Sequence, residues 1–125
     1  MARKQPELEI DLRLRLRRGE DIAMGPGKAD LLEAIAAAGS ISGGARKMGM
    51  SYRRAWLLVE TMNRAFGQPL VRAKTGGNSG GGAEVTEIGL AAVEAYRRLQ
   101  REALRVVERG LPGLKRKLGK SRSSL

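Results

Sequence analysis

Four consecutive residues, Ser51 to Arg54, bring together the side chains best suited to chemistry in this sequence. They supply two hydroxyl groups and two guanidinium groups directly before a periodic apolar run that ends at Met62. Arginine pairs bidentately with guanine edges and with phosphate, and a helix N-terminus attracts phosphate. The pattern therefore predicts recognition of a nucleic acid. We assign Arg53 to base edges, and Ser51, Tyr52 and Arg54 to bases or backbone.

The composition excludes several other chemistries. The 125 residues contain no histidine and no cysteine, which removes imidazole bases, thiol nucleophiles, disulfides and most transition-metal sites. The acidic residues are scattered instead of paired, so we expect no enzyme and no cofactor. With 24 Lys and Arg against 13 Asp and Glu, the net charge of +11 favours a polyanionic partner, double-stranded DNA above all. The alternative is a basic surface that serves only solubility.

The elements that must position Arg53 form a predicted helix-turn-helix. Ala45 is small enough for two helices to cross closely, and Gly49 lies where the turn needs a positive φ. Ser40 or Ser42 is expected to cap a first helix at about 43–48. Ser51 is expected to cap a second helix at about 52–66.

Further contacts are predicted around this motif. Arg46 and Lys47 suit backbone phosphates, as do Ser40 and Ser42, although Arg46 and Lys47 could also form an ordinary solvated face. Trp56 is open to two interpretations. A lone tryptophan usually lies in a core, yet helical geometry places it nearer the outer face.

A hairpin after the second helix is predicted to be a wing. Strands are expected at 70–74 and 83–86, joined by the glycine-rich loop 76–82. Asn78 and Ser79 could donate to phosphate, with Arg72 and Lys74 beside them. A nucleotide-binding loop is disfavoured, because no lysine follows the glycines and a strand, not a helix, comes next.

Upstream of the motif, residues 1–6 are predicted to be a disordered arm. Strict alternation over 7–17 predicts a strand with one buried face, paired with a short return strand at 22–24. Its unpaired edge is expected to be covered by a terminus or a second subunit. A first helix should run from Gly25-Pro26 to Gly39, with Leu31, Leu32, Ile35 and Ala38 on its inner face.

A long helix is predicted from a Thr86 cap to about Arg109, ended by Pro112. Its apolar face exceeds what one small domain needs and suits a twofold dimer contact, although it could simply cover its own domain. The predicted contact residues are Ile88, Ala92, Ala95, Tyr96, Leu99, Ala103 and Val106. The expected domain is 7–111, with a basic flexible tail at 112–125. With no apolar run of about 20 residues and no signal peptide, we expect a cytoplasmic protein.

Three segments carry a family resemblance: Ser40 to Ala45, Met50 to Trp56, and Thr75 to Gly89 with its Ala-x-Val-Thr-x-x-Gly pattern. They resemble the N-terminal DNA-binding domain of the molybdate-responsive ModE regulators, and the wider pattern is similar to LysR-type regulators. The match covers about Leu8 to Leu104. It implies a winged helix-turn-helix that dimerises through its first and last helices on an inverted-repeat operator. The molybdate-binding domain of the family has no room in 125 residues, so no molybdate site is expected here.

The expected fold is therefore mainly α with a small β wing, an N-terminal β-hairpin and a long C-terminal helix. The favoured function is a sequence-specific, homodimeric DNA-binding regulator, with a link to molybdenum-related genes. Two alternatives stand beside it. One is an interaction module that forms heterodimers with a longer homologue, and the other is a nonspecific nucleoid-type binder that uses charge alone.

Overall fold

The computed structural model describes residues 7–74 and 81–119 of the chain. Within these residues the elements follow in the order β1 (Leu16–Arg18), β2 (Asp21–Met24), α1 (Pro26–Ala38), α2 (Ile41–Met48), α3 (Tyr52–Phe66), β3 (Val71–Ala73), β4 (Ala83–Val85) and α4 (Glu87–Lys115). β1 pairs antiparallel with β2, and β3 pairs antiparallel with β4, in two separate sheets. The predicted fold class is confirmed.

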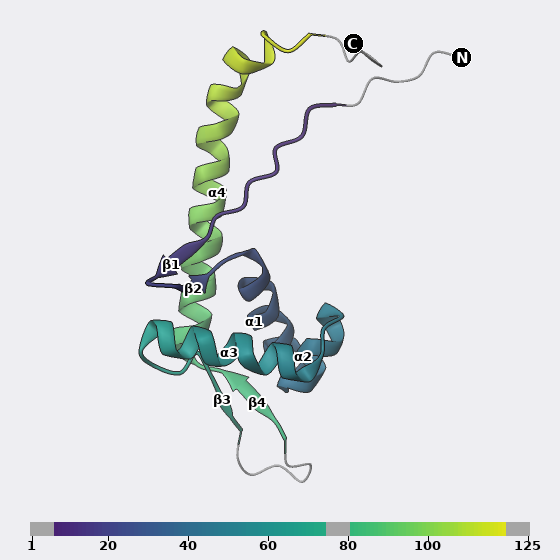
Figure 1. Ribbon diagram of the computed structural model, residues 1–125, viewed down its shortest axis with the longest axis vertical. Helices are drawn as coiled ribbons and strands as arrows, with labels where there is room; N and C mark the ends of the chain where they lie inside the picture. Colours follow the sequence, from purple (N-terminus) through teal and green to yellow (C-terminus); the bar gives the residue numbers. More distant parts are fainter. Residues whose placement is uncertain (1–6, 75–80, 120–125) are drawn as a thin grey trace, which may run out of the picture.

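The elements form a compact base and a long projection. Figure 1 shows α1, α2 and α3 grouped around one end of α4, with the β3–β4 hairpin extending beneath α3. The remainder of α4 and the N-terminal segment project away on the opposite side. No helix of the described residues is long and apolar enough to cross a membrane.

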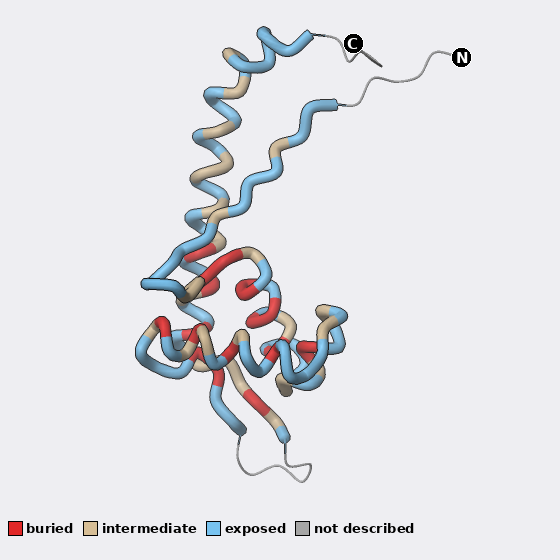
Figure 2. The backbone as a smooth tube through the Cα atoms, viewed as in Figure 1, coloured by how far each residue is buried: buried red, intermediate tan, exposed pale blue. Residues whose placement is uncertain are grey.

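The core lies in the base, where Figure 2 places the buried residues. It is built mainly from aliphatic side chains, because the sequence has few aromatic residues. Tyr96 from α4 completes it at 2% exposure. The other large side chains that are almost fully buried are Met24, Leu31, Leu32, Ile35, Met62 and Leu70.

Helix α1 matches its predicted bounds and most of its predicted inner face. Pro26 occupies its first turn, and Gly39 ends it at φ 76°, with its N–H donating to the Ile35 carbonyl at 2.8 Å. Ala38 is a correction, because it is exposed. A Cβ at Gly43 would lie 2.7 Å from Ala38 Cβ, but Gly43 has no side chain to cover it.

Helices α1 and α2 approach each other most closely at Gly44. A Cβ atom at Gly44 would lie 2.6 Å from Ile35 Cγ1 and 3.0 Å from the Ile35 backbone nitrogen. Ala45, predicted to allow a close crossing of the two helices of the helix-turn-helix, is buried in the core beside it at 2% exposure. The close approach of α1 and α2 depends on Gly44, which the sequence analysis did not single out.

The N-terminal strand is much shorter than predicted. Only Leu16–Arg18 pair with β2, and the register shifts between Leu16 and Arg17, so residues 7–15 have no strand partner. The alternation does not produce a buried face either, since Leu8, Leu12 and Leu16 are 44%, 37% and 40% exposed. Because β2 has four residues, it cannot pair with a strand of eleven.

The C-terminal helix is longer than predicted. α4 continues through Pro112 to Lys115, so the prediction that Pro112 ends it is wrong. Proline removes one backbone donor, and here the turn is exposed, so water can bond the carbonyl that the missing N–H leaves free. The next turn still closes, since the Arg116 N–H donates to the Pro112 carbonyl at 3.1 Å.

Candidate nucleic-acid interface

The turn between α2 and α3 has the predicted geometry. Ser40 caps α2, its hydroxyl accepting from the Gly43 N–H at 2.9 Å, whereas Ser42 lies exposed within the first turn. Gly49 has φ 67° and ends α2, and the Met50 N–H returns to the Ala45 carbonyl at 3.0 Å. These local bonds satisfy some of the orphan groups at the two ends of α2 and shape the turn that leads to α3.

The two faces of α3 separate as the sequence indicates. Ala55, Val59 and Met62 are buried, and they turn the opposite face of the helix toward solvent. The Ser51 hydroxyl caps the helix by accepting from the Arg54 N–H at 3.1 Å. The four residues Ser51 to Arg54 are all exposed.

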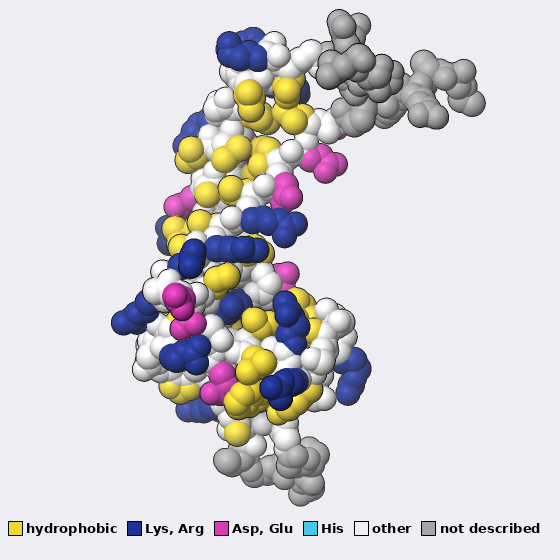
Figure 3. Space-filling view, viewed as in Figure 1, with side chains coloured by type: hydrophobic (Ala, Val, Ile, Leu, Met, Phe, Trp, Pro, Cys, Tyr) yellow, Lys and Arg dark blue, Asp and Glu magenta, His cyan; other side chains and the backbone are white. Residues whose placement is uncertain are grey.

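Trp56 lies on the outer face of α3, so helical geometry, and not the usual core position of a lone tryptophan, describes it correctly. Its side chain is 43% exposed, and Tyr52, one helical turn before it, is 56% exposed. Arg46 and Lys47 on α2 are exposed as well. Figure 3 shows Lys and Arg side chains over the N-terminal segment and over the short helices on the face in view.

The strands of the wing lie close to their predicted positions. Arg72 is opposite Glu84 in the register, and its Nε donates to Glu84 Oε1 at 2.9 Å. Lys74 is exposed, and its backbone N–H donates to the Gly82 carbonyl at 2.9 Å. Asn78 and Ser79 lie outside the described residues. Of the four predicted wing residues, Arg72 therefore already has an anionic partner in its own chain.

One residue that the sequence analysis missed ties the wing to α3. Asn63 Oδ1 accepts from the Leu70 N–H at 2.8 Å, and Asn63 Nδ2 donates to the Val71 carbonyl at 3.2 Å. This amide therefore holds the start of β3 against the helix that carries Arg53. A signal was present, because Asn63 falls four residues after Val59 on the inner face of α3, where a polar side chain needs a partner.

The predicted dimer residues of α4 divide into exposed, half-buried and buried side chains. Ile88, Leu99 and Val106 are 42%, 46% and 59% exposed, and Ala95 is exposed too. Ala92 and Ala103 are half-buried.

Tyr96 is a correction to that set. It is buried within its own chain, and its hydroxyl donates to the Leu14 carbonyl at 2.6 Å. Its hydroxyl therefore contacts the N-terminal segment of the same molecule, a contact that the sequence analysis did not predict. Burial raises the pKa of the Tyr96 phenol.

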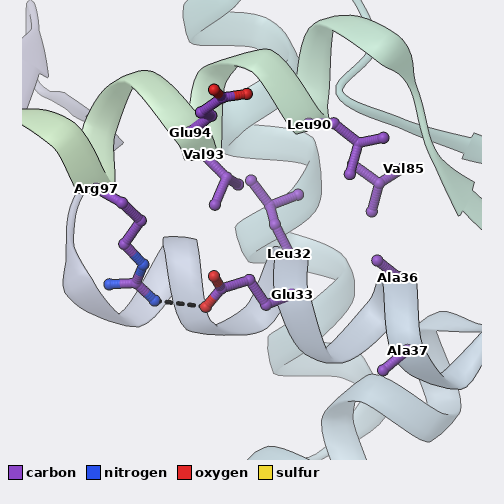
Figure 4. Close-up of a pocket in the computed structure, with 9 residues that line it drawn as sticks. All are labelled: Leu32, Glu33, Ala36, Ala37, Val85, Leu90, Val93, Glu94 and Arg97. Carbon is purple, nitrogen blue, oxygen red and sulfur yellow. Dashed lines mark hydrogen bonds and ion pairs between the residues drawn. The ribbon is translucent and has the colours of Figure 1, made fainter.

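An apolar groove of about 550 Å³ lies between α1 and α4 (Figure 4). Leu32, Val93 and Leu90 line it, and Arg97 stands at one end. Arg97 donates to Glu33 and to Asp30, each at 2.6 Å. The hydrogen bond that Arg97 donates to Glu33 is the main reason that the pKa of Arg97 is raised. This ion-pair cluster joins α4 to α1 beside the exposed apolar face.

Together, the capped helix pair, the hairpin and the long helix define a winged helix-turn-helix fold. The fold resembles the DNA-binding domain of CbnR, solved as a complex with DNA, with TM-score 0.54 and 22% identity over 70% of this chain and 94% of that one. It also resembles full-length LysG from Corynebacterium glutamicum with bound arginine, with TM-score 0.52 and 23% identity over 76% of this chain and 30% of that one. No family model matches the chain.

Comparison with proteins of similar sequence gives more specific information than the fold does. The chain is 45% identical over 101 residues to the molybdenum-pterin-binding protein MopA of Rhodobacter capsulatus, which is 78% of this chain and 38% of MopA. It is 36% identical over 89 residues to the transcriptional dual regulator ModE of Escherichia coli K12, which is 71% of this chain and 34% of ModE. The chain is thus homologous to the N-terminal regions of ModE and MopA, which confirms the resemblance. It spans little more than a third of these relatives' length.

Proposed function

We propose that this chain is the DNA-binding part of a transcription regulator that reads a specific operator as a homodimer, and that the regulated genes concern molybdenum. The observation that carries the proposal is the exposed first turn of α3, where Arg53 follows a serine cap and no acidic residue is present. Such a helix end combines a positive dipole, free N–H groups and a guanidinium group. The names of the relatives support the same class, since ModE is a DNA-binding regulator and CbnR was solved with DNA.

Affinity and specificity would come from different residues. The net charge of +11 supplies attraction to phosphate that does not depend on sequence. Specificity would come from Arg53 in the major groove, with Tyr52 and Trp56 beside it. Arg46 and Lys47 on α2, together with the wing, would fix the register on the backbone.

The homodimer is proposed from the free part of α4. The buried residues of this helix are Gly89, Val93 and Tyr96, all in its first third. Beyond them, apolar side chains such as Leu99 and Val106 are exposed, and Figure 3 shows hydrophobic side chains along this part of the helix. A second outer groove of about 600 Å³ runs along α4 past Ala95 and Leu99. An isologous pairing of two copies would cover this face and bring two copies of α3 into one dimer.

Selection of bound sequences from a pool of random duplexes tests the proposal. A homodimer should recover an inverted repeat whose half-sites lie one helical turn, about 34 Å, or a multiple of it, apart. A pool without any enriched sequence, combined with a steep salt dependence, would instead indicate a nonspecific binder.

Substitution of Arg53 then tests the recognition residue. Arg53→Ala should reduce the preference for the recovered site over random DNA by roughly 5- to 150-fold, equivalent to about 1–3 kcal/mol. The matched control is Arg101→Ala, which removes an exposed arginine from α4 and should keep that preference. If Arg53→Ala retains the full preference, the assignment of Arg53 to base edges is wrong.

A further inference from the structure

A pocket that shares only Arg54 with the predicted DNA contacts lies where the N-terminal segment passes the start of α1 and the side of α3. Its volume is about 320 Å³. Of its ten lining residues, four are cationic and none is acidic: Arg13, Arg15, Lys28 and Arg54 carry the charge, and Ile22, Gly25, Pro26, Gly27, Met50 and Leu58 form the rest. These four cations come from three separate parts of the chain.

Lys28 is the unusual member of this group. It is a buried charged residue at 8% exposure. No acceptor in the described part of the chain bonds its ammonium, and every fully buried side-chain polar atom described has a partner. The ammonium must therefore reach solvent, and the pocket that Lys28 lines is the place where it can do so.

The charges around Lys28 leave it poorly compensated. Burial lowers the pKa of Lys28, and the nearby charges of Arg54 and Arg15 lower it further. Asp21 acts in the opposite direction, but its carboxylate is held by Arg64 through bonds of 3.2 and 3.3 Å. A cation that is buried among other cations is costly unless an anion joins it.

The start of α1 adds backbone donors to the same pocket. The N-cap residue, Gly25, makes no side-chain capping bond, and the first turn contains no acidic residue. The first helical bond is donated by Ala29 to the Gly25 carbonyl at 3.0 Å, so the N–H groups of Gly27 and Lys28 precede it. A Cβ at Gly27 would meet nothing within 4 Å, which leaves this backbone open to a ligand.

We propose that this pocket binds a phosphate-type oxyanion between the Lys28 ammonium, the guanidinium groups of Arg13, Arg15 and Arg54, and the first N–H groups of α1. Two sources share this chemistry. One is a DNA backbone phosphate beside the groove that α3 contacts, and this source depends on the function proposed above. The other is free inorganic phosphate. Arg54 favours the DNA source, because it follows Arg53 directly on α3.

The first arm of the test uses inorganic phosphate and thermal unfolding. The midpoint of the wild-type protein should rise in phosphate relative to chloride at equal ionic strength. Lys28→Met keeps the length of the buried side chain but removes its charge, so it should fold and lose that rise. Lys117→Met, which changes an exposed lysine of the tail, should retain the rise. If Lys28→Met does not fold, Arg13→Gln with Arg15→Gln replaces it, because both arginines are exposed.

The second arm measures binding to a random-sequence duplex at several salt concentrations. The logarithm of the binding constant falls as the logarithm of the salt concentration rises. If a backbone phosphate occupies the pocket, Lys28→Met should make this negative slope shallower by about 0.9. The same relation corresponds to a loss of about fivefold in affinity at about 0.15 M salt. Lys117→Met should leave the slope unchanged.

The outcomes of the two arms separate the sources. A phosphate response without a change in slope assigns the pocket to free phosphate, and a change in slope assigns it to DNA. Equal behaviour of Lys28→Met and wild type in both arms overturns the proposal. Failure of the proposed function would look different, because the protein would then show no preferred sequence even if the slope depended on Lys28.

Discussion

The contact between α1 and α2 at Gly44 leads to a prediction with a definite sign. Gly44→Ala places a Cβ 2.6 Å from Ile35 Cγ1, 3.0 Å from the Ile35 backbone nitrogen and 3.1 Å from Ile35 Cα. The Ile35 side chain can rotate, but the backbone atoms cannot move without the helix. Because Ile35 is itself fully buried, the added methyl group must push α1 and α2 apart.

Two opposing contributions determine how much Gly44→Ala changes the free energy of unfolding. Overpacking a well-packed core usually costs about 1–3 kcal/mol in the free energy of unfolding. Replacing glycine by alanine inside a helix returns up to about 1 kcal/mol. The expected net change is a destabilisation of about 1 kcal/mol, which corresponds to a fall of roughly 4 °C in the unfolding midpoint for a chain of this size.

Gly110→Ala is the matched control. Gly110 lies in α4, and a Cβ there would meet nothing within 4 Å. The same chemical change should therefore stabilise the protein by about 0.5–1 kcal/mol. Thermal and urea unfolding followed by circular dichroism measure both variants. The reasoning would be refuted if Gly44→Ala raised the midpoint as Gly110→Ala does.

Two further predictions concern hydrogen bonds that join distant parts of the chain. Tyr96→Phe removes the donor to the Leu14 carbonyl and should cost about 1 kcal/mol near neutral pH. Because the folded-state pKa of Tyr96 is raised, its contribution is complete below the ordinary phenol pKa and is lost as the pH rises through the folded value. Urea unfolding across this alkaline range should show a smaller decline for Tyr96→Phe than for wild type, and an equal decline would contradict the burial argument. Asn63→Ala leaves the Leu70 N–H without its acceptor and should cost about 1–3 kcal/mol in urea unfolding, so a change below about 0.5 kcal/mol would show that water replaces the amide.

Local signals predicted the helix-turn-helix well. Ser40, Gly49 and Ser51 act within a few residues of themselves, so their capping and turn roles can be recognised from sequence alone. The exposed end of α3 followed from the same logic, because the buried residues on one face of a helix determine which residues lie on the other. The outer position of Trp56 also followed from geometry, although its residue type suggested the core.

Features that depend on distant partners were not predictable in this way. Alternation over residues 7–17 describes an extended chain, but a strand also needs a partner, and β2 is too short to provide one. Tyr96 lies on the predicted apolar stripe of α4, and only the path of the N-terminal segment decides that it is buried. The close approach of α1 to α2 at Gly44 depends on how α1 is oriented, which periodicity along α2 does not determine.

The bond from Tyr96 to the Leu14 carbonyl joins residues 82 positions apart. This hydrogen bond closes a segment of the chain that contains both sheets and the helix-turn-helix. The described ends of the chain, residues 7 and 119, lie on the side of this bond that is opposite the wing (Figure 1). A folded domain joined to either end would accordingly begin well away from α3, and it could be bulky without blocking the approach of a duplex to Arg53.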